Sequence, residues 1–376
     1  SSQTMFTLLG DPAVRLAYPK ERVYTTAVTT TASDTLKAFS KVTVTGYVGD
    51  TSGNPDNNFN GLLYPTTYDK PNHLVTDSNP NPTGNVHFHF DLQNSILNKG
   101  LISINKGKFS FSYVIPKDIN YNYGFGKISY YAENGTTDAT GNDQKIVVGG
   151  SKSNVFISNK GPQVRLYMND SNFAYGGMTN QNPELYALVF DSNGINTTGN
   201  GIGHNITAVL DNNTQNTYDL TNSFQPALNS YQRGIIAFPF SSLSSGTHTV
   251  SLRVWNVFNA STQASTEFNV EQQSNLQLQH VLNYPNPFTT HTDFYFEINQ
   301  VCDLLDVQIQ IFTVAGKLVR NILTTIKTDS FRSPPIPWDG RDQFGDKIAN
   351  GVYIYHVLVR TNEGKVADTY QKLVIL

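Results

Sequence analysis

The stretch KFSFSYV at residues 108–114 decides the fold class of this chain, because apolar and polar residues alternate along it. Successive side chains of a β-strand point to opposite faces, so a period of two predicts a strand with one buried face. Residues 41–48 and 86–90 alternate in the same way, and residues 127–132 and 145–148 are further predicted strands. Short runs at this spacing are typical of a β-sandwich.

The composition excludes several classes of protein. The chain has 376 residues, of which 15% are charged and 12% aromatic, and its formal net charge is −3. No basic field is present to attract nucleic acid, so no nucleic-acid partner is expected. No apolar run approaches the roughly 20 residues of a membrane-spanning helix. The composition is typical of an exported protein, but residues 1–4 do not open a signal peptide, so we expect a piece of a longer precursor.

Breaks in the strand pattern divide the chain into four parts: a stub at residues 1–19, then domains at residues 20–157, 158–271 and 272–376. The second domain has strands predicted at residues 163–168, 184–190, 205–210, 234–240, 247–255 and 265–270. The third has strands predicted at residues 306–312, 317–323, 351–360 and 369–376. The fold class that we predict is all-β, with tandem immunoglobulin-like β-sandwich domains. No Cys pair flanks Trp255, so the antibody type is excluded.

Cys302 is the only thiol and the only candidate nucleophile of the cysteine type. A catalytic thiolate needs a lowered pKa and a nearby imidazole, whereas Asp303 and Asp306 are acidic neighbours that raise a thiol pKa. Free cysteine is usually a small buried hydrophobe. The sequence therefore favours a structural Cys302 and assigns no catalytic residue.

Two groups of histidines are alternative candidates. His87 and His89 form an H-x-H pair that shares one strand face and could reach one metal ion. The alternation of residues 86–90 is equally that of an amphipathic strand, which we favour. His204 follows a Gly-Ile-Gly run that lacks the Lys-Ser/Thr and helix of a phosphate loop.

Oxygen-rich turns are candidate sites for a structural calcium ion, and no other cofactor is expected. The candidate ligands are Asp56, Asn58, Asn60, Asp191, Asn193 and Asn196. In the first turn Thr67 stands where a calcium loop places a bidentate Glu, so a polar turn is favoured over a metal site. A third acidic turn contains Asp339, Asp342 and Asp346 and has the same alternatives.

The strand pair at residues 351–376 is the most useful partner surface. An edge strand offers unpaired N–H and C=O groups that a partner can extend. The alternative is that charges such as Lys365 and Asp368 protect this edge.

Several stretches, taken in their order along the chain, resemble the sequence of one family. They are residues 6–16 (FTLLGDPAVRL), 60–70 (NGLLYPTTYDK), 116–121 (PKDINY), 191–197 (DSNGINT), 201–204 (GIGH), 283–288 (NYPNPF), 338–342 (WDGRD) and 351–355 (GVYIY). Together they resemble the C-terminal region of the PorU family, the gingipain-like cysteine peptidases that act as sortases of the Bacteroidetes type IX secretion system. The third domain alone is similar to type IX C-terminal sorting domains and to FlgD-like immunoglobulin domains.

The resemblance implies a role for the whole protein. It would be a cysteine peptidase and transpeptidase that removes sorting domains from secreted cargo and transfers the new C-terminus to an anionic lipopolysaccharide. It would lie on the cell surface, peripheral to the outer membrane, held by a barrel protein of the PorV type that binds the third domain. The stub at residues 1–19 would end the upstream peptidase domain. The family's catalytic Cys and His lie before that stub, so none is carried over. Residues 372–376 lack the terminal basic residue common in sorting domains, so the chain is also expected to be trimmed.

Another class of function stays open. The chain could be an adhesin or carbohydrate-binding cargo protein with an ordinary sorting domain, in which Trp255 and Trp338 would contact glycans. A fragment that is itself an enzyme would need an activated nucleophile or a metal site, and none assembles from the sequence.

Overall fold

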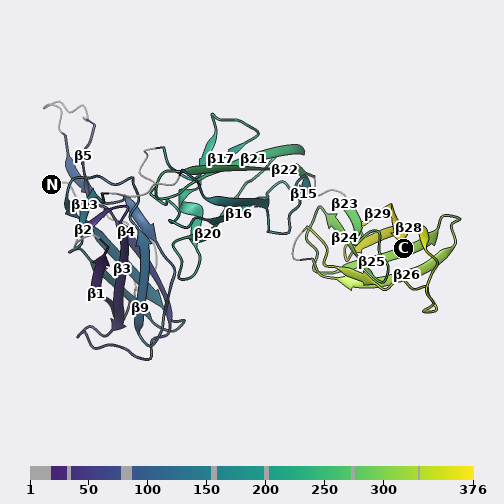
Figure 1. Cartoon of the computed structure of the whole chain (residues 1–376), viewed down its shortest axis with the longest axis horizontal. Coiled ribbons are helices and arrows are strands. Elements are labelled where there is room, and N and C mark those ends of the chain that lie inside the picture. Colours follow the sequence, from purple (N-terminus) through teal and green to yellow (C-terminus); the bar gives the residue numbers. More distant parts are fainter. Residues whose placement is uncertain are drawn as a thin grey trace, which may run out of the picture.

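The computed structural model describes residues 18–31, 35–77, 87–153, 159–198, 203–271, 276–328 and 331–376. Within these ranges the chain consists of β-strands and connecting loops, with one 3-10 turn, η1, at Thr221–Ser223. The all-β sandwich prediction is therefore confirmed. Figure 1 shows three β-sandwiches that follow one another along the chain. In the part described, no helix is long and apolar enough to span a membrane. Apart from its last two residues, the predicted stub lies outside the described ranges.

The first sandwich has a large sheet in the order β7-β4-β11-β12-β1-β3-β9, with β8 also paired to β4, and a small sheet in the order β10-β13-β2. Buried side chains of both sheets form one hydrophobic core. Its strands are β1 (Glu21–Thr30), β2 (Thr35–Ala38), β3 (Lys41–Gly49), β4 (Gly61–Tyr68), β5 (Asn72–Val75), β6 (His89–Leu92), β7 (Ile96–Lys99), β8 (Ile102–Ile104), β9 (Lys108–Val114), β10 (Gly124–Phe125), β11 (Lys127–Glu133), β12 (Asp138–Asp143) and β13 (Val147–Ser151).

Strand β4 contains a proline inside a sheet, and the topology explains why it is tolerated. Pro65 has no N–H to donate, and its carbonyl accepts the N–H of Gly100. Gly100 lies where the neighbouring chain is divided into β7 and β8, which pair with opposite ends of β4. Because the ladder is interrupted at that point, the missing donor breaks no regular pair.

The predicted strand at residues 86–90 is wrong in its bounds and in its setting. Val86 lies outside the described residues, and the strand begins only at His89. It pairs with β5 in an isolated two-stranded hairpin whose eight strand residues are all exposed. The predicted burial of one face is therefore not present.

The strand predicted at residues 145–148 begins at Val147, because Lys145 donates its N–H to Asp143 in a turn.

The second sandwich consists of two sheets, β14-β16-β20-β19 and β15-β22-β21-β17-β18. Their facing side chains form a second core. The strands are β14 (Gln163–Met168), β15 (Gly177–Thr179), β16 (Glu184–Phe190), β17 (Thr207–Leu210), β18 (Thr217–Asp219), β19 (Phe224–Pro226), β20 (Arg233–Pro239), β21 (Gly246–Trp255) and β22 (Ser261–Val270).

The third sandwich packs the sheet β23-β24-β27 on the sheet β26-β25-β28-β29. Strands β28 and β29 form the predicted hairpin, and Gly364 in its turn has a φ of 83°, which favours glycine. The strands are β23 (Leu278–Tyr284), β24 (Thr292–Ile298), β25 (Leu305–Thr313), β26 (Leu318–Ile326), β27 (Ile336–Trp338), β28 (Gly351–Thr361) and β29 (Val366–Ile375).

Candidate functional site

Cys302 has the surroundings of a structural residue. Its side chain belongs to the third core, and only 7% of the residue is exposed. The Sγ atom contacts Gln300, with distances of 3.7 Å to Nε2 and 3.8 Å to the carbonyl oxygen. The described residues provide no imidazole partner for the thiol, because the histidines of this sandwich bond Glu297, Thr290 and Asp368. The geometry therefore offers no Cys–His pair.

The histidines of the exposed hairpin pair in a way that the sequence did not indicate. His89 Nδ1 lies 3.3 Å from Nε2 of His73, whose Nδ1 is 2.9 Å from Asp91. His87 instead bonds the Thr76 carbonyl. No group of three His, Cys, Asp or Glu side chains that could hold a metal ion occurs among the described residues. The pairing of His73 with His89 was not predicted, because the sequence of one strand does not show which residues of the neighbouring strand lie opposite it.

The first candidate calcium turn bonds largely to itself. Asp56 Oδ1 accepts the N–H of Asn58, and Asn60 Oδ1 accepts the N–H of Lys106. Glu21 lies beside this turn. Burial, and after it the Asp56 and Asp50 carboxylates, raise the pKa of Glu21. A structural calcium ion here stays a prediction.

In the second candidate turn, protein groups bond oxygens of both Asp191 and Asn196. Asp191 accepts hydrogen bonds from Asn193 N–H and from Asn256 Nδ2. Asn196 Oδ1 accepts both the N–H and the hydroxyl of Thr198. Calcium at this turn also stays a prediction. In the third turn, Asp342 Oδ1 accepts two backbone N–H groups, as in an ordinary Asp turn.

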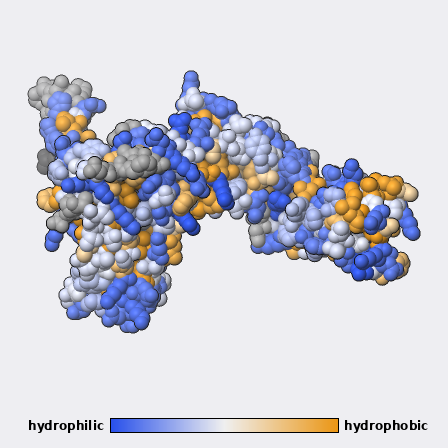
Figure 2. Space-filling model, viewed as in Figure 1, coloured by the Kyte–Doolittle hydropathy of each residue, from blue (hydrophilic) through white to orange (hydrophobic). Residues whose placement is uncertain are grey.

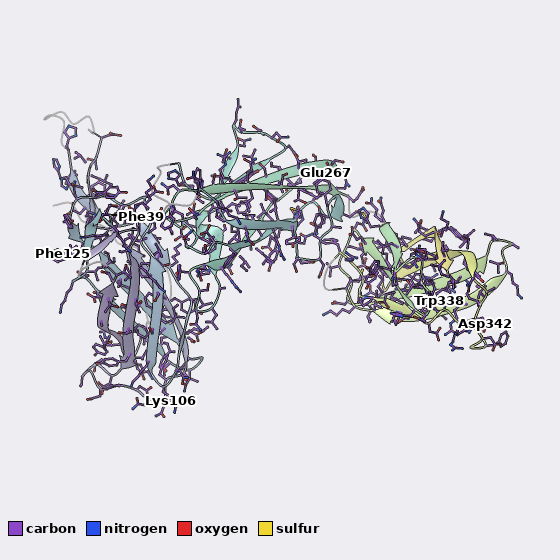
Figure 3. The ribbon with its side chains drawn as sticks, in the orientation of Figure 1. Phe39, Lys106, Phe125, Glu267, Trp338 and Asp342 are labelled. Carbon is purple, nitrogen blue, oxygen red and sulfur yellow. The ribbon has the colours of Figure 1, made fainter. Side chains whose placement is uncertain are left out.

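A buried carboxylate joins the first and second sandwiches. Asp118, in the first, accepts hydrogen bonds from His204, Asn196 and Asn259 of the second, at 2.8, 3.0 and 2.6 Å. Nearby, Phe39 packs edge-on against Phe258 at 5.4 Å, and Figure 3 shows Phe39 at the end of the first sandwich that faces the second. His204 therefore lies at the contact between the first two sandwiches, and Gly201 and Ile202 of its motif lie outside the described residues.

The two tryptophans are not open platforms for a glycan. Trp338 is only 3% exposed and packs between Phe288 and Phe294 inside the third core. Trp255 is half-buried beneath the His204 ring, at 4.4 Å between ring centroids. The predicted availability is therefore wrong for Trp338, which is used in core packing, whereas Trp255 keeps part of its surface exposed beside the His204 ring.

Exposed apolar side chains gather instead on the third sandwich. In the described ranges, 25 large hydrophobic residues are exposed, and twelve of them belong to the third sandwich. Five of them share the outer face of the sheet β26-β25-β28-β29: Leu318, Leu323, Val352, Val366 and Tyr370. We call this the third outer face. Figure 2 shows hydrophobic surface gathered on this sandwich. Polar residues such as Gln308 and Gln310 of β25 share this face and lie between the apolar residues of β26 and those of β28 and β29. Exposed apolar side chains grouped on one sheet are a feature of interaction sites.

Both edges of the same sheet are partly covered by loops of the domain itself. Phe288 pairs with the outer side of β29, donating to Val374 and accepting from Leu376, and Asn286 adds two bonds to the same strand. On β26, Gln343 donates its N–H to the Val319 carbonyl. The charges expected to protect the edge have other partners: Asp368 bonds His356, and Lys365 bonds Gln300. The open face of this sheet and the parts of its edges without such contacts are therefore the surfaces that the domain itself does not cover.

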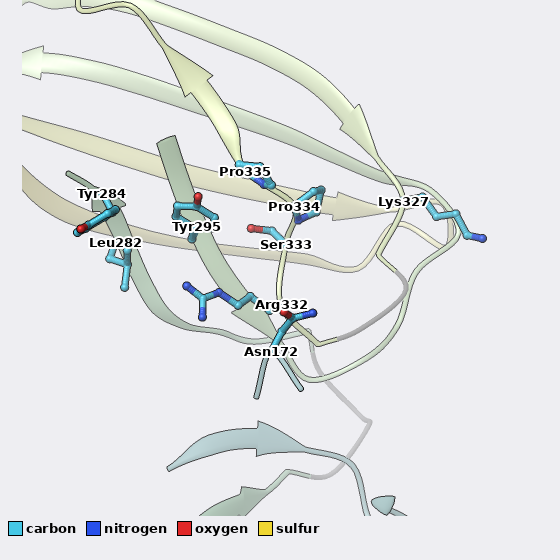
Figure 4. Close-up of a pocket in the computed structure, with 9 residues that line it drawn as sticks. All are labelled: Asn172, Leu282, Tyr284, Tyr295, Lys327, Arg332, Ser333, Pro334 and Pro335. Atoms are coloured by element: carbon cyan, nitrogen blue, oxygen red, sulfur yellow. The ribbon is translucent and has the colours of Figure 1, made fainter. Parts of the chain in front are cut away.

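A cleft lies where the second sandwich meets the third (Figure 4). Its floor contains Tyr284 and Tyr295 of β23 and β24, and Asn172 approaches from the second sandwich. The Arg332 guanidinium lies over the Tyr295 ring at 5.2 Å. Tyr284 is 70% exposed, so this cleft, rather than the tryptophans, offers an open aromatic surface.

Comparison with known proteins gives weak likenesses. No protein-family model matches the chain, and none of the curated proteins does. Among solved structures, the chain is similar to dimeric latent PorU from Porphyromonas gingivalis, with 29% identity over 98% of this chain and a TM-score of 0.43. The match covers 35% of that protein, so the chain spans about a third of its length.

Two further solved structures are similar at lower identity. One is a tetra-tandem repeat from the extending region of a large adhesion protein, with 13% identity over 96% of this chain and 74% of that one, at a TM-score of 0.21. The other is the SGBP-B protein of the Bacteroides ovatus mixed-linkage glucan locus in complex with a heptasaccharide. It has 11% identity over 94% of this chain and 70% of that one, at a TM-score of 0.29.

Proposed function

We propose that this chain is the noncatalytic C-terminal region of a PorU-like sortase of the type IX secretion system. The first two sandwiches brace the cysteine peptidase domain, and the third docks to an outer-membrane barrel of the PorV type. The assembly lies on the cell surface, where the parent protein cleaves cargo sorting domains and attaches the cargo. Support comes from the motifs that follow one another in order along the chain.

The observation that carries the docking role is the third outer face. Its leucines, valines and tyrosine are exposed on a regular sheet rather than scattered on loops. Covering them would remove apolar surface from water, at about 25 cal/mol for each Å². Tyr370 stacks on His356 at 4.2 Å, so it is held in place before a partner arrives.

Pull-down of the chain with a purified PorV-type barrel in detergent tests this role. Leu323→Lys together with Tyr370→Ala should weaken binding at least about tenfold, since both side chains lie on the third outer face. Leu228→Lys is the matched control, because Leu228 is an exposed leucine of the second sandwich. Absence of binding by a folded chain would remove the docking role.

The second candidate function is a carbohydrate-binding or adhesive cargo protein. The junction cleft favours it, because exposed tyrosines in a cleft can stack on sugar rings. A glycan array with the chain tests this function, and Tyr284→Ala should abolish any hit that uses the cleft. A clear hit of this kind, together with loss of the third sandwich from the mature protein in cells, would replace the sortase assignment.

A further inference from the structure

In the sheet β14-β16-β20-β19 of the second sandwich, strand β16 carries apolar residues on both faces. Strand β16 reads ELYALVF, and its inner residues Leu185, Ala187 and Val189 are buried in the core. Its outer residues include Leu188 and Phe190, which are half-buried and line an open groove. Strands that are apolar on both faces are typically covered on both sides. The outer face of this sheet therefore has the composition of an interface.

An open groove of about 540 Å³ lies on this outer face. Its floor contains Leu188, Phe190 and Ile235, and two arginines frame it from the flanking strands. The register places Arg165 opposite Leu188, and Leu188 opposite Ile235, in one row across the sheet. Arg233 lies opposite Phe190 in the next row, with its guanidinium over the Phe190 ring at 5.3 Å.

The charged side chains that line the groove are all positive. Both Arg165 and Arg233 are exposed, and neither forms an ion pair with a carboxylate within the described part of the chain. No acidic side chain is among the residues that line the groove. Asp191, which follows Phe190, is buried and bonds Asn193 and Asn256. Two guanidinium groups beside an apolar floor complement a partner that carries both carboxylates and an apolar side chain.

The geometry also gives the spacing of those groups. Arg165 and Arg233 are separated by two strand spacings and one side-chain row, which is about 12 Å between Cα atoms. An extended peptide spans about 13 Å between residues i and i+4, and its residue i+2 projects to the same side. Phe190 is the one aromatic residue that lines the groove, and the Arg233 guanidinium already lies over its ring. The remaining floor is aliphatic, which favours an apolar side chain over a sugar ring, because a sugar prefers an aromatic face.

We propose that this groove binds an extended acidic segment of a partner protein, in which an apolar residue lies between two acidic residues spaced four apart. The apolar side chain packs on Leu188 and Ile235, and one carboxylate pairs with each arginine. This interaction is independent of docking through the third sandwich.

Fluorescence polarisation with the full chain tests the proposal. The probe is a labelled peptide Ser-Asp-Thr-Leu-Thr-Asp-Ser, and the control peptide has Asn in place of both Asp residues. We expect measurable binding of the acidic peptide alone, and weaker binding as salt rises from about 0.05 M to about 0.5 M. The double variant Arg165→Glu/Arg233→Glu should lose at least about tenfold in affinity and gain affinity for the peptide with Lys in place of Asp.

The control double variant Arg22→Glu/Arg253→Glu makes the same change of net charge on exposed arginines outside the groove, and its affinity should stay within about twofold. If the charge-reversed protein does not fold, Arg165→Gln/Arg233→Gln should still show the loss. Equal binding of the acidic and Asn peptides would overturn the proposal. Equal affinity of the two double variants, or binding of an oligogalacturonate in place of the peptide, would also overturn it.

Discussion

His204 donates a 2.8 Å hydrogen bond from Nδ1 to Oδ2 of Asp118, and this contact crosses from the second sandwich to the first. The carboxylate is 8% exposed and also accepts from two asparagine side chains of the second sandwich. A single buried anion therefore accepts hydrogen bonds from three donors on two loops, the connection between β16 and β17 and the turn between β21 and β22. Its loss would leave those donors without an acceptor in a place that water reaches poorly.

Asp118→Ala should destabilise the junction of the first two sandwiches by about 3 kcal/mol, because removal of one member of a buried polar cluster leaves its partners unpaired. Chemical denaturation of the chain measures this change in free energy. Asp346→Ala, in an exposed turn of the third sandwich, should change stability by less than about 0.5 kcal/mol. A similar effect for both variants would contradict the role given to Asp118.

The stability of the second sandwich should depend on pH through His248. Burial lowers the pKa of His248, but the Ser244 carbonyl and the Asp211 carboxylate raise it more, so the pKa lies above its usual value of 6.5. A raised pKa in the folded state means that protonation favours folding. This stabilisation is fully present below the unfolded pKa of about 6.5 and is lost as pH rises through the folded pKa.

Comparison of Tm values for the native chain and His248→Gln between pH 5 and 8 checks this prediction, since glutamine does not titrate. The native chain should exceed the variant most at low pH, and the difference should shrink as pH rises. A difference that grows with pH would show that the neutral imidazole is the favoured form.

Much of the strand pattern could be predicted because many strands bury one face. Strands β9 and β14 have the predicted bounds, and β9 has the alternating burial that its period of two predicts. Strand β4 was not predicted as a strand, because Pro65 is a breaker unless the neighbouring ladder is divided at the same place. That division depends on residues about forty positions away, so a local pattern does not contain it.

The candidate sites were harder to predict than the strands. Exposure of Trp255 and Trp338 was expected from residue type, but both rings contact residues distant in sequence. The third outer face was also not predicted, because its five apolar residues come from three strands whose register only the fold provides. The contact between His204 and Asp118 was not predicted either, because it joins residues 86 positions apart in the sequence.

Cys302 should be unreactive in the native protein. The residue is buried in the third core, and its main-chain N–H is held by the Thr328 hydroxyl at 2.8 Å. Reagents such as Ellman's reagent attack the exposed thiolate, so the thiol should react only after unfolding. Titration of the thiol with and without denaturant measures this protection. Rapid reaction of the native chain would contradict the structural role of Cys302.

Removal of the hairpin formed by β5 and β6 should leave the first sandwich folded. All eight of its strand residues are exposed, and an isolated two-stranded hairpin contributes little stability in water. Replacement of residues 72–92 by a short Gly-Ser linker should shift Tm by less than about 4 °C, the effect of about 1 kcal/mol. Replacement of residues 61–68, the central strand β4, is the control in which the first sandwich should lose its stability. A large loss of stability from hairpin removal would mean that the hairpin packs on other parts of the chain.

Asn286 should control access to one edge of the third sandwich. Its side chain accepts the N–H of Val374 and donates to the Lys372 carbonyl, so it satisfies two outward backbone groups of β29. Asn286→Ala should raise hydrogen exchange at Val374 and lower the free energy of unfolding by about 1–2 kcal/mol, because two hydrogen bonds are lost. Thr290→Ala, in the same loop, should leave exchange at Val374 unchanged, since Thr290 makes its side-chain bond with His291 rather than with β29.

Because an uncovered edge strand recruits another strand, the Asn286 variant should also self-associate more at high protein concentration, which sedimentation measures. Unchanged exchange at Val374 would mean that the backbone pairing of Phe288 alone closes this edge.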